Sequence, residues 1–400
     1  MHTKLLIFGI TGDLSRRKLL PALHDIVQSG ECAPLSIIGV SRRDVDVVHL
    51  ISEATGSDAL VASTRVVSMD LTVLEDYQRL REDVALTDDE QLVIYLSVPP
   101  GAAADIADFL GKAGINTPNV KLLFEKPFGF DTQSAEDFIT RTQQHFTDDQ
   151  IYRIDHFMAK EVAMAVLELR ANADSHHHGW SNETVERVEV IATETLGIEN
   201  RATFYEQTGA LRDIIQGHLI QLVSLVLMEP VSKDTLENLP SHRLAALERL
   251  QPADASAAIR AQYDGYQEEV DNPGSQTETF VSLDLESRDP RWTGVPIRLL
   301  TGKQLHEKKT AITIEYRDGS KDIFIEGEVA SAIDSLRDAY ERVLVEAIKG
   351  NKYIFTTSPE ITQSWKLLAP LQQAWQMGDQ PLLRYEKGAR AANVHLKHYI

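Results

Sequence analysis

Hydrophobic and polar positions alternate along the first third of the chain in a pattern that predicts strands and helices in turn. Short apolar runs, each typical of a buried strand, occupy residues 5–8, 35–40, 91–98 and 120–124. Helical patterns lie between them, for example at residues 14–23 and 102–112. Strands that alternate with helices favour βαβ units and a parallel sheet.

A glycine motif follows the first apolar run. The segment Gly9-Ile10-Thr11-Gly12-Asp13-Leu14 reads G-x-x-G, with Ser15 where a third glycine of the dinucleotide fingerprint would stand. Glycines at a strand-to-helix turn let a ligand approach the backbone, and the helix N-terminus favours a phosphate. Because the motif is incomplete, a tight turn that binds nothing is the alternative.

The second apolar run ends in Ser41-Arg42-Arg43. In a dinucleotide fold the tip of the second strand meets the adenosine ribose, where an arginine accommodates the 2′-phosphate of NADP. The planar guanidinium groups of two arginines suit such a phosphate, although a solvated loop has the same composition. Together with the glycine turn, this position predicts an NADP-binding domain.

Beyond residue 150 the pattern changes. A long apolar helix is expected at residues 209–228, followed by a polar stretch at 233–275, strands at 278–285, 295–300, 311–316 and 321–326, and helices at 335–348 and 360–376. Alternation such as Thr279-Phe280-Val281-Ser282-Leu283 indicates an antiparallel sheet with one covered face. We therefore expect an α/β Rossmann-type domain at residues 1–151 and an α+β domain on a mainly antiparallel sheet at residues 152–400.

Composition narrows the class of protein. The 400 residues are 43% hydrophobic and 25% charged, as in ordinary globular proteins, and can form two or three domains. The net charge of −20 argues against nucleic acid as a partner, because phosphate contacts need clustered lysine and arginine. A single cysteine, Cys32, fits a reducing compartment. The longest strongly apolar stretch, 219–228, is too short to span a membrane, so we expect a cytoplasmic protein.

Two basic residues, His156 and Lys160, are four positions apart. Apolar Val162, Val166 and Leu169 continue a helical spacing, so both basic side chains are expected on one face of the first helical turn. Such a face near a helix N-terminus binds a dianion, although a solvated face is the plainer alternative.

A lone histidine, His218, lies in the apolar helix. An imidazole there is the usual proton acceptor near neutral pH if a carboxylate sets its tautomer, and the alternative is a core histidine without chemistry. At ~100° per residue, Asp213 is about 140° around the helix from His218 and need not be the partner. Asp155 is then available for that role.

Two further groups are less informative. Lys303 and Lys308 follow the strand run at 295–300, where a surface loop is the default expectation. His176-His177-His178 lies in a polar loop without a second ligand cluster near it in sequence, so no metal site is expected.

With these pieces assembled, the chain resembles the glucose-6-phosphate dehydrogenase family over most of its length. The matching segments occur in the family's order, and Arg153-Ile154-Asp155-His156-Phe157-Met158-Ala159-Lys160 is the most specific of them. The others are Gly9–Leu14, Ser41-Arg42, Glu125–Gly129, Glu194 with Gly197, Gly209–His218, Gly302-Lys303 with Lys308, Asp338–Arg342 and Trp365–Pro370.

The resemblance implies that glucose 6-phosphate is oxidised to a lactone with NADP as cofactor. His218 would be the base that takes the proton from the anomeric hydroxyl, and Asp155 would hold its imidazole. The cofactor would be bound by Gly9, Thr11, Gly12, Asp13, Leu14, Arg42, Tyr95 and Lys126. The substrate would be bound by Lys126, His156, Lys160, Glu194, Asp213, Lys303 and Lys308.

Departures from the family's pattern qualify these expectations. Phe157 stands where the family usually has tyrosine, Gly217 replaces an asparagine and Ala159 a glycine. The chain is also shorter than typical members, mainly between Glu326 and Ser335, where they carry further strands. We therefore expect a monomer or weak homodimer. The alternatives are a dehydrogenase of another or unphosphorylated sugar, and an NADP-binding sensor or scaffold without catalysis.

Overall fold

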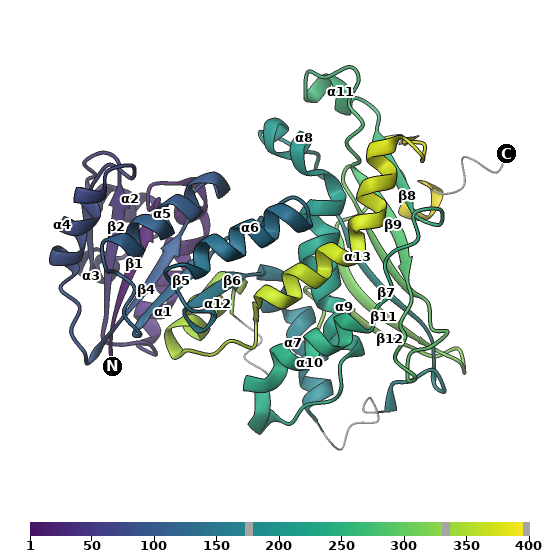
Figure 1. Ribbon diagram of the computed structural model, residues 1–400, viewed down its shortest axis with the longest axis horizontal. Coiled ribbons are helices and arrows are strands. Elements are labelled where there is room, and N and C mark those ends of the chain that lie inside the picture. The colour runs from purple at the N-terminus through teal and green to yellow at the C-terminus, as the bar shows by residue number, and fades with distance from the viewer. Residues whose placement is uncertain (173–178, 330–336, 395–400) are drawn as a thin grey trace. The chain divides into compact units, whose positions relative to one another are not determined.

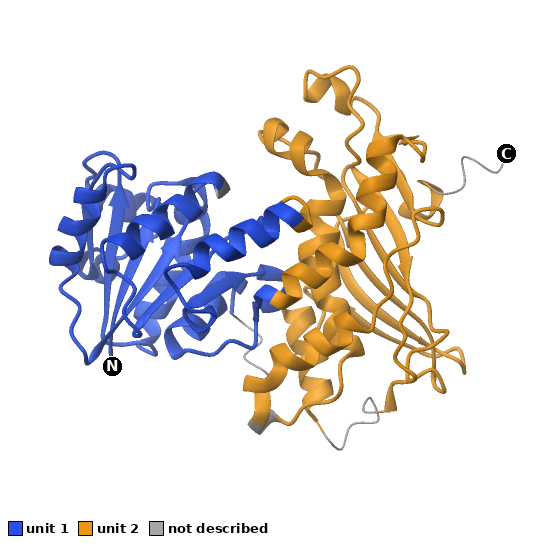
Figure 2. Cartoon of the chain, viewed as in Figure 1, with its two compact units in different colours: residues 1–129, 133–159, 336–358 blue, residues 130–132, 160–335, 359–400 orange. Residues whose placement is uncertain are grey.

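The computed structural model describes residues 1–172, 179–329 and 337–394, and His176–His178 therefore lie outside the described residues. The chain divides into two compact units (Figure 2). The first unit comprises residues 1–129, 133–159 and 336–358, and the second comprises 130–132, 160–335 and 359–400. The first unit thus runs past the expected boundary at residue 151 to residue 159, and the chain returns to it near its C-terminal end.

The first unit is built on a seven-stranded sheet with the order β13-β6-β5-β4-β1-β2-β3 (Figure 1). Strands β1 to β6 are parallel, and their order is the one found in doubly wound dinucleotide-binding folds. The strands are β1 His2–Phe8, β2 Leu35–Ser41, β3 Thr64–Ser68, β4 Glu90–Leu96, β5 Val120–Phe124, β6 Ile151–Ile154 and β13 Phe355–Thr356.

The predicted strands of this sheet are confirmed, but β3 and β6 were not expected. Strand β3 is partly exposed at the sheet edge and has no apolar run, and β6 has four residues. Strand β13 pairs antiparallel with β6, with Phe355 opposite Ile154. Because this pairing joins segments about two hundred positions apart, no local sequence pattern predicts it.

Helices complete the first unit. Helix α1 packs against α2, α3 and α12, whereas α4 and α5 pack against each other. The helices are η1 Ser15–Leu19, α1 Leu20–Ser29, α2 Val47–Ala54, α3 Asp58–Ser63, α4 Leu74–Val84, α5 Pro100–Lys112, α6 Thr132–Gln143, η2 Asp148–Gln150, η3 His156–Ala159 and α12 Ala339–Lys349.

The turn after β1 approaches the end of β4 very closely. Gly9 has φ +80°, and a Cβ atom there would lie 2.1 Å from the carbonyl oxygen of Ser97. The buried hydroxyl of Ser15 donates to the carbonyl oxygen of Gly9 (2.9 Å) and lies 3.2 Å from the hydroxyl of Ser97. Serine at the third position of the motif therefore closes the turn.

The second unit has a seven-stranded sheet with the order β12-β11-β7-β10-β9-β8-β14. The strands are β7 Val185–Thr193, β8 Ile259–Tyr263, β9 Phe280–Leu285, β10 Ile297–Gly302, β11 Lys309–Tyr316, β12 Lys321–Ile325 and β14 Leu383–Tyr385. Strand β7 pairs in parallel with β10, and β8 with β14, while the other pairs are antiparallel. The sheet is therefore mixed, and its parallel neighbours β7 and β10 are separated in sequence by several helices and by strands β8 and β9.

Helices cover this sheet. They are α7 Glu161–Ala171, α8 Ala202–Ala210, η5 Leu211–Leu219, α9 Ile220–Leu227, η6 Lys233–Asn238, α10 Leu239–Glu248, α11 Tyr266–Glu269, α13 Ser358–Met377 and α14 Ala391–Val394. The π-helix η5 packs against β7, β9 and β10. Helix α9 packs against α7 and α10 (Figure 1). The polar stretch at 233–275 thus contains a helix, α10, and a strand, β8, that the sequence analysis did not predict.

One helical run, Ala202–Leu227, is long and apolar enough to cross a membrane by length and composition. However, 78% of its most apolar window is buried inside the protein. A core helix of a globular domain has the same character, so this run gives only weak support for a membrane span.

The close approach at Gly9 gives a stability prediction. Gly9→Ala combines a left-handed backbone with a clash against main-chain atoms, and we expect it to lower the free energy of unfolding by about 2–4 kcal/mol in urea titrations. Gly30→Ala is the matched control, because Gly30 also has positive φ (+68°) but nothing within 4 Å of the added Cβ. Equal decreases in the free energy of unfolding of both variants would show that the clash with Ser97 adds nothing to the cost of the left-handed backbone.

Candidate functional site

The glycine turn lies at the carboxyl ends of β1 and β4, in the middle of the first sheet. The amide of Gly12 donates to the carbonyl oxygen of Gly9 (2.9 Å), which keeps the turn tight. Thr11, Gly12 and Leu14 are partly exposed, and the exposed carboxylate of Asp13 pairs with Arg17 (2.8 Å). An exposed backbone turn at the switch point of a doubly wound sheet is the place where a diphosphate binds.

Two exposed arginines, Arg42 and Arg43, follow β2. Within the described ranges of the chain, neither guanidinium has a carboxylate at ion-pair distance. The amide of Arg43 donates to the hydroxyl of Ser41 (3.2 Å), so the backbone bends directly after the strand. Cationic groups of this kind fit the 2′-phosphate of a dinucleotide.

Tyr95 and Lys126 lie near the ends of neighbouring parallel strands, β4 and β5. The buried hydroxyl of Tyr95 donates to the carboxylate of Glu125, the residue before Lys126. Burial raises the pKa of Glu125 to about 7, and the hydrogen bond from Tyr95 opposes this rise only in part. The sequence analysis quoted Glu125 in a motif but gave it no role, since its burial depends on the sheet.

Asp155 and His156 follow β6, the last parallel strand. Asp155 is buried, and its Oδ1 accepts a hydrogen bond from the amide of Phe157 (3.0 Å). The ring of His156 lies nearly parallel to that of Tyr340 in α12, at 6.2 Å between centroids and 13° between planes. Tyr340 belonged to a family segment but was not expected beside His156.

The expectation that His156 and Lys160 share one helical face is wrong. His156 lies in the 3₁₀-helix η3, which ends at Ala159, and Lys160 has an extended backbone (φ −75°, ψ 157°) as the residue before α7. A face defined by i,i+4 spacing requires one continuous α-helix, and the helix is interrupted here. The two residues also belong to different units.

In the second unit, Glu194, Lys303 and Lys308 emerge at one edge of the sheet. Glu194 follows β7 and Lys303 follows β10, and the last residues of these parallel strands, Thr193 and Gly302, pair with each other. Lys308 precedes β11, whose first residue lies opposite Thr193. Strand pairing therefore brings together three residues that are far apart in sequence.

Lys303 is buried, not part of the surface loop that was the default expectation. Its ammonium group pairs with the carboxylate of Glu194 and lies 5.2 Å from the centroid of the Tyr205 ring. The hydroxyl of Tyr385 donates to the main-chain carbonyl of Lys303 (2.7 Å). Tyr205 and Tyr385, which sequence reasoning missed, thus fix both ends of this lysine.

His218 is buried in η5, with 3% of its surface exposed, and Asp213 is partly exposed in the same helix. Hydrogen bonds in a π-helix run from residue i to i+5, so residues five apart are about one turn apart. Asp213 and His218 therefore lie on one face. The expected separation of about 140° is wrong because it assumed α-helical winding.

The start of η5 is fixed by a buried carboxylate. Gly209 has φ +66° and interrupts the helical run, and a Cβ there would lie 2.5 Å from Oε1 of Glu278. The same oxygen accepts a hydrogen bond from the amide of Leu211 (2.9 Å). Burial raises the pKa of Glu278, whereas the Leu211 amide at the helix N-terminus favours its charged form. Glu278 was not recognised from the sequence.

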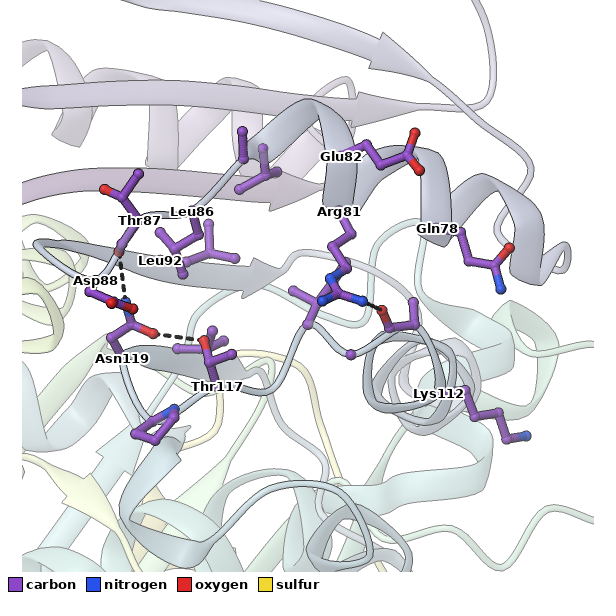
Figure 3. Close-up of a pocket in the computed structure, with 17 residues that line it drawn as sticks. Gln78, Arg81, Glu82, Leu86, Thr87, Asp88, Leu92, Lys112, Thr117 and Asn119 are labelled. Atoms are coloured by element: carbon purple, nitrogen blue, oxygen red, sulfur yellow. Dashed lines mark hydrogen bonds between the residues drawn. The ribbon is translucent and has the colours of Figure 1, made fainter.

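A cavity of about 930 Å³ lies elsewhere in the first unit, among the loops before β4 and β5 (Figure 3). Arg81 points from α4 toward the end of α5 and donates to the carbonyl oxygen of Ala113 (3.4 Å). None of the candidate site residues lines this cavity, which is at the amino ends of the strands. Ligands of doubly wound sheets bind at the opposite, carboxyl ends.

Comparison with protein families agrees with this arrangement. Residues 6–164 match the model described as the glucose-6-phosphate dehydrogenase NAD binding domain. Residues 167–336 and 326–398 match the model described as the glucose-6-phosphate dehydrogenase C-terminal domain, in two segments that overlap at 326–336.

Individual relatives carry the same name. The glucose-6-phosphate 1-dehydrogenase of Mycolicibacterium smegmatis is 30% identical over 458 residues, covering 96% of this chain and 92% of the relative. That of Dickeya dadantii is 28% identical over 458 residues, covering 96% and 93%. Since both alignments exceed 400 residues, these relatives contain residues that this chain lacks.

Solved structures are similar over the whole chain. Glucose-6-phosphate 1-dehydrogenase from Mycobacterium avium has a TM-score of 0.84 and 27% identity, covering 97% of this chain and 94% of that one. A glucose-6-phosphate dehydrogenase in complex with its substrate glucose-6-phosphate has a TM-score of 0.87 and 25% identity, covering 100% and 98%. The chain therefore belongs to the glucose-6-phosphate dehydrogenase family.

Proposed function

We propose that this protein oxidises D-glucose 6-phosphate to 6-phospho-D-glucono-1,5-lactone with reduction of NADP, the first step of the oxidative pentose phosphate pathway. The observation that carries the proposal is the position of His218 on a helix packed against β7 and β10, the strands that are directly followed by Glu194 and Lys303. A family member with this arrangement retains both a proton acceptor and sugar-binding groups. This reaction and the single cysteine favour a cytoplasmic location for the enzyme.

His218 acts as the general base. It takes the proton from the anomeric hydroxyl, and Asp155 stabilises the imidazolium that forms. NADP, held by the glycine turn and Arg42, would supply the acceptor for the hydride that leaves the anomeric carbon, so that a carbon–oxygen double bond remains in the lactone. Lys126, Glu194, Asp213 and Lys303 bind the sugar hydroxyls, and His156 and Lys160 bind the phosphate, with Lys308 closing the site. These roles rest on the family's motifs and on the burial and grouping described above.

NADP is proposed over NAD because of Arg42 and Arg43. An enzyme that selects NAD usually carries an acidic residue at the end of the second strand, where the free ribose hydroxyl binds. Here the same position carries two arginines, and the charge of Arg42 adds to hydrogen bonds from Thr72 in lowering the pKa of the exposed carboxylate of Asp70. Gly9, Thr11, Gly12, Asp13, Leu14, Tyr95 and Lys126 complete the proposed cofactor contacts.

A second candidate is the oxidation of an unphosphorylated sugar by the same chemistry. Two observations favour it: Phe157 has no hydroxyl for a phosphate, and the carboxylate of Glu326 already lies beside Lys160. An absorbance assay for NADPH with a panel of sugars and sugar phosphates distinguishes the two functions. Activity with glucose 6-phosphate above that with glucose supports the first, and the reverse order supports the second.

Substitution of the base tests the mechanism. We expect His218→Asn to lower kcat by ~10²–10⁴-fold, the usual cost of removing a general base, while substrate still binds. His49→Asn is the control, because His49 is an exposed histidine of the first unit. Near-normal kcat in His218→Asn would exclude His218 as the base.

Cofactor choice is tested at Arg42. Charge-assisted hydrogen bonds contribute ~1.5–3 kcal/mol, so Arg42→Ala should weaken NADP binding by ~10–150-fold in fluorescence titrations. NAD binding should change little, because NAD has no 2′-phosphate. Arg43→Ala, measured in parallel, shows how far the second arginine substitutes for the first. Equal weakening of both cofactors would place Arg42 at another part of the dinucleotide.

The oligomeric state follows from the shortened chain. In the described part of the chain, β12 is an edge strand of the second sheet, and the alignments show that relatives have additional residues. A stable dimer should bury more than ~1,000 Å², and we expect the reduced sheet to fall short of this. Light scattering should give a monomer or weak dimer at micromolar concentration. A tight dimer at nanomolar concentration would contradict the prediction.

A further inference from the structure

An acidic residue, Glu326, lies at the same ends of the strands of the second sheet as the proposed substrate-binding residues Glu194, Lys303 and Lys308. It directly follows β12, whose last residue, Ile325, is opposite Ala311 near the start of β11. The amide of Glu326 donates to the carbonyl oxygen of Thr310 (2.9 Å). Because β11 begins just after Lys308, this pairing brings Glu326 close to Lys308.

The carboxylate of Glu326 forms an ion pair with Lys160, at 3.0 Å between Oε2 and Nζ. The lysine side chain is 19% exposed, so the pair is partly shielded from water. Burial raises the pKa of Glu326, but the charges of Lys160 and Lys308 and a hydrogen bond from Thr310 outweigh burial and lower it. Glu326 is therefore an anion at neutral pH, paired with Lys160 and attracted by the charge of Lys308.

The segment around Glu326 departs from the family's pattern. The two matches to the C-terminal domain overlap at residues 326–336, and the alignments with relatives contain residues that this chain lacks. The carboxylate thus stands at the junction where the chain is shortened. Its ion pair with Lys160 is formed within the second unit and does not depend on the placement of the first.

We propose that Glu326 is a specificity-determining residue that competes with the substrate phosphate for Lys160 and so weakens the preference for a phosphorylated sugar. This inference rests on the proposed function for the identity of the substrate. A phosphate carries about two negative charges at neutral pH, so it must displace the carboxylate or bind beside a like charge. Both events reduce phosphate affinity, and a tethered carboxylate is always present at high effective concentration.

The first test compares wild type, Glu326→Gln and Glu328→Gln. Glu328 is an exposed carboxylate two residues further on and serves as the matched control. Partly exposed ion pairs contribute up to ~1 kcal/mol, so Glu326→Gln should lower KM for glucose 6-phosphate by about 2–5-fold with kcat unchanged. Neither kcat nor KM for free glucose should change. An unchanged KM for glucose 6-phosphate, or an equal change for both sugars, overturns the proposal.

A double variant identifies the group for which Glu326 competes. If the carboxylate acts on Lys160, adding Glu326→Gln to Lys160→Ala should give less improvement than Glu326→Gln gives alone. A full and additive gain in the double variant would show that Glu326 acts elsewhere.

Binding of inorganic phosphate gives a readout that does not require catalysis. In calorimetric titrations at low salt, Glu326→Gln should bind inorganic phosphate about 2–5-fold more tightly than wild type, and Glu328→Gln should match wild type. If the wild type oxidises no sugar phosphate, the proposed function fails, while this titration still decides the role of Glu326. Equal phosphate affinity in all three proteins overturns the inference.

Discussion

Parallel pairing of neighbouring strands is the constraint on which the candidate sites of both units depend. Parallel strands end at the same edge, so the residues that follow them are brought together however far apart they are in sequence. In the first unit this places the Gly9 turn beside the end of β4. In the second it places Glu194 beside Lys303, because Thr193 and Gly302 pair in register. The candidate side chains are therefore positioned by main-chain hydrogen bonds between the strands.

The helix of the proposed base depends on a second, local constraint. Glycine at 209 allows a buried carboxylate, Glu278, to reach the amide of Leu211 at the start of η5. The π-helical winding that follows is rare and is frequently found at functional sites. It places Asp213 and His218 on one face of the helix. Their angular separation around the helix axis therefore depends on the backbone geometry as well as on their spacing in sequence.

Two lysines of the candidate site in the second unit are paired with neighbouring carboxylates. The net charge is −20, and two of the basic residues proposed to bind substrate pair with carboxylates of their own unit: Lys303 with Glu194 and Lys160 with Glu326. Such pairs reduce the cost of burying a lysine in the absence of substrate. At Lys160, the pair also means that an anionic ligand would have to exchange with the carboxylate of Glu326. A local count of positive residues would therefore overestimate the attraction for a phosphate.

The sequence by itself determined the doubly wound sheet, the glycine turn, the arginines after β2 and the family motifs, because these features depend on local apolar runs and short segments. It did not determine the return of α12 and β13 to the first unit, the parallel pairing in the second sheet or the π-helix at His218. These features depend on contacts between segments that are distant in sequence. Bringing such segments together closes a long loop, and neither segment carries a periodic pattern that predicts the contact. Only the tertiary structure decided that Glu326 lies against Lys160, since strand register sets that contact.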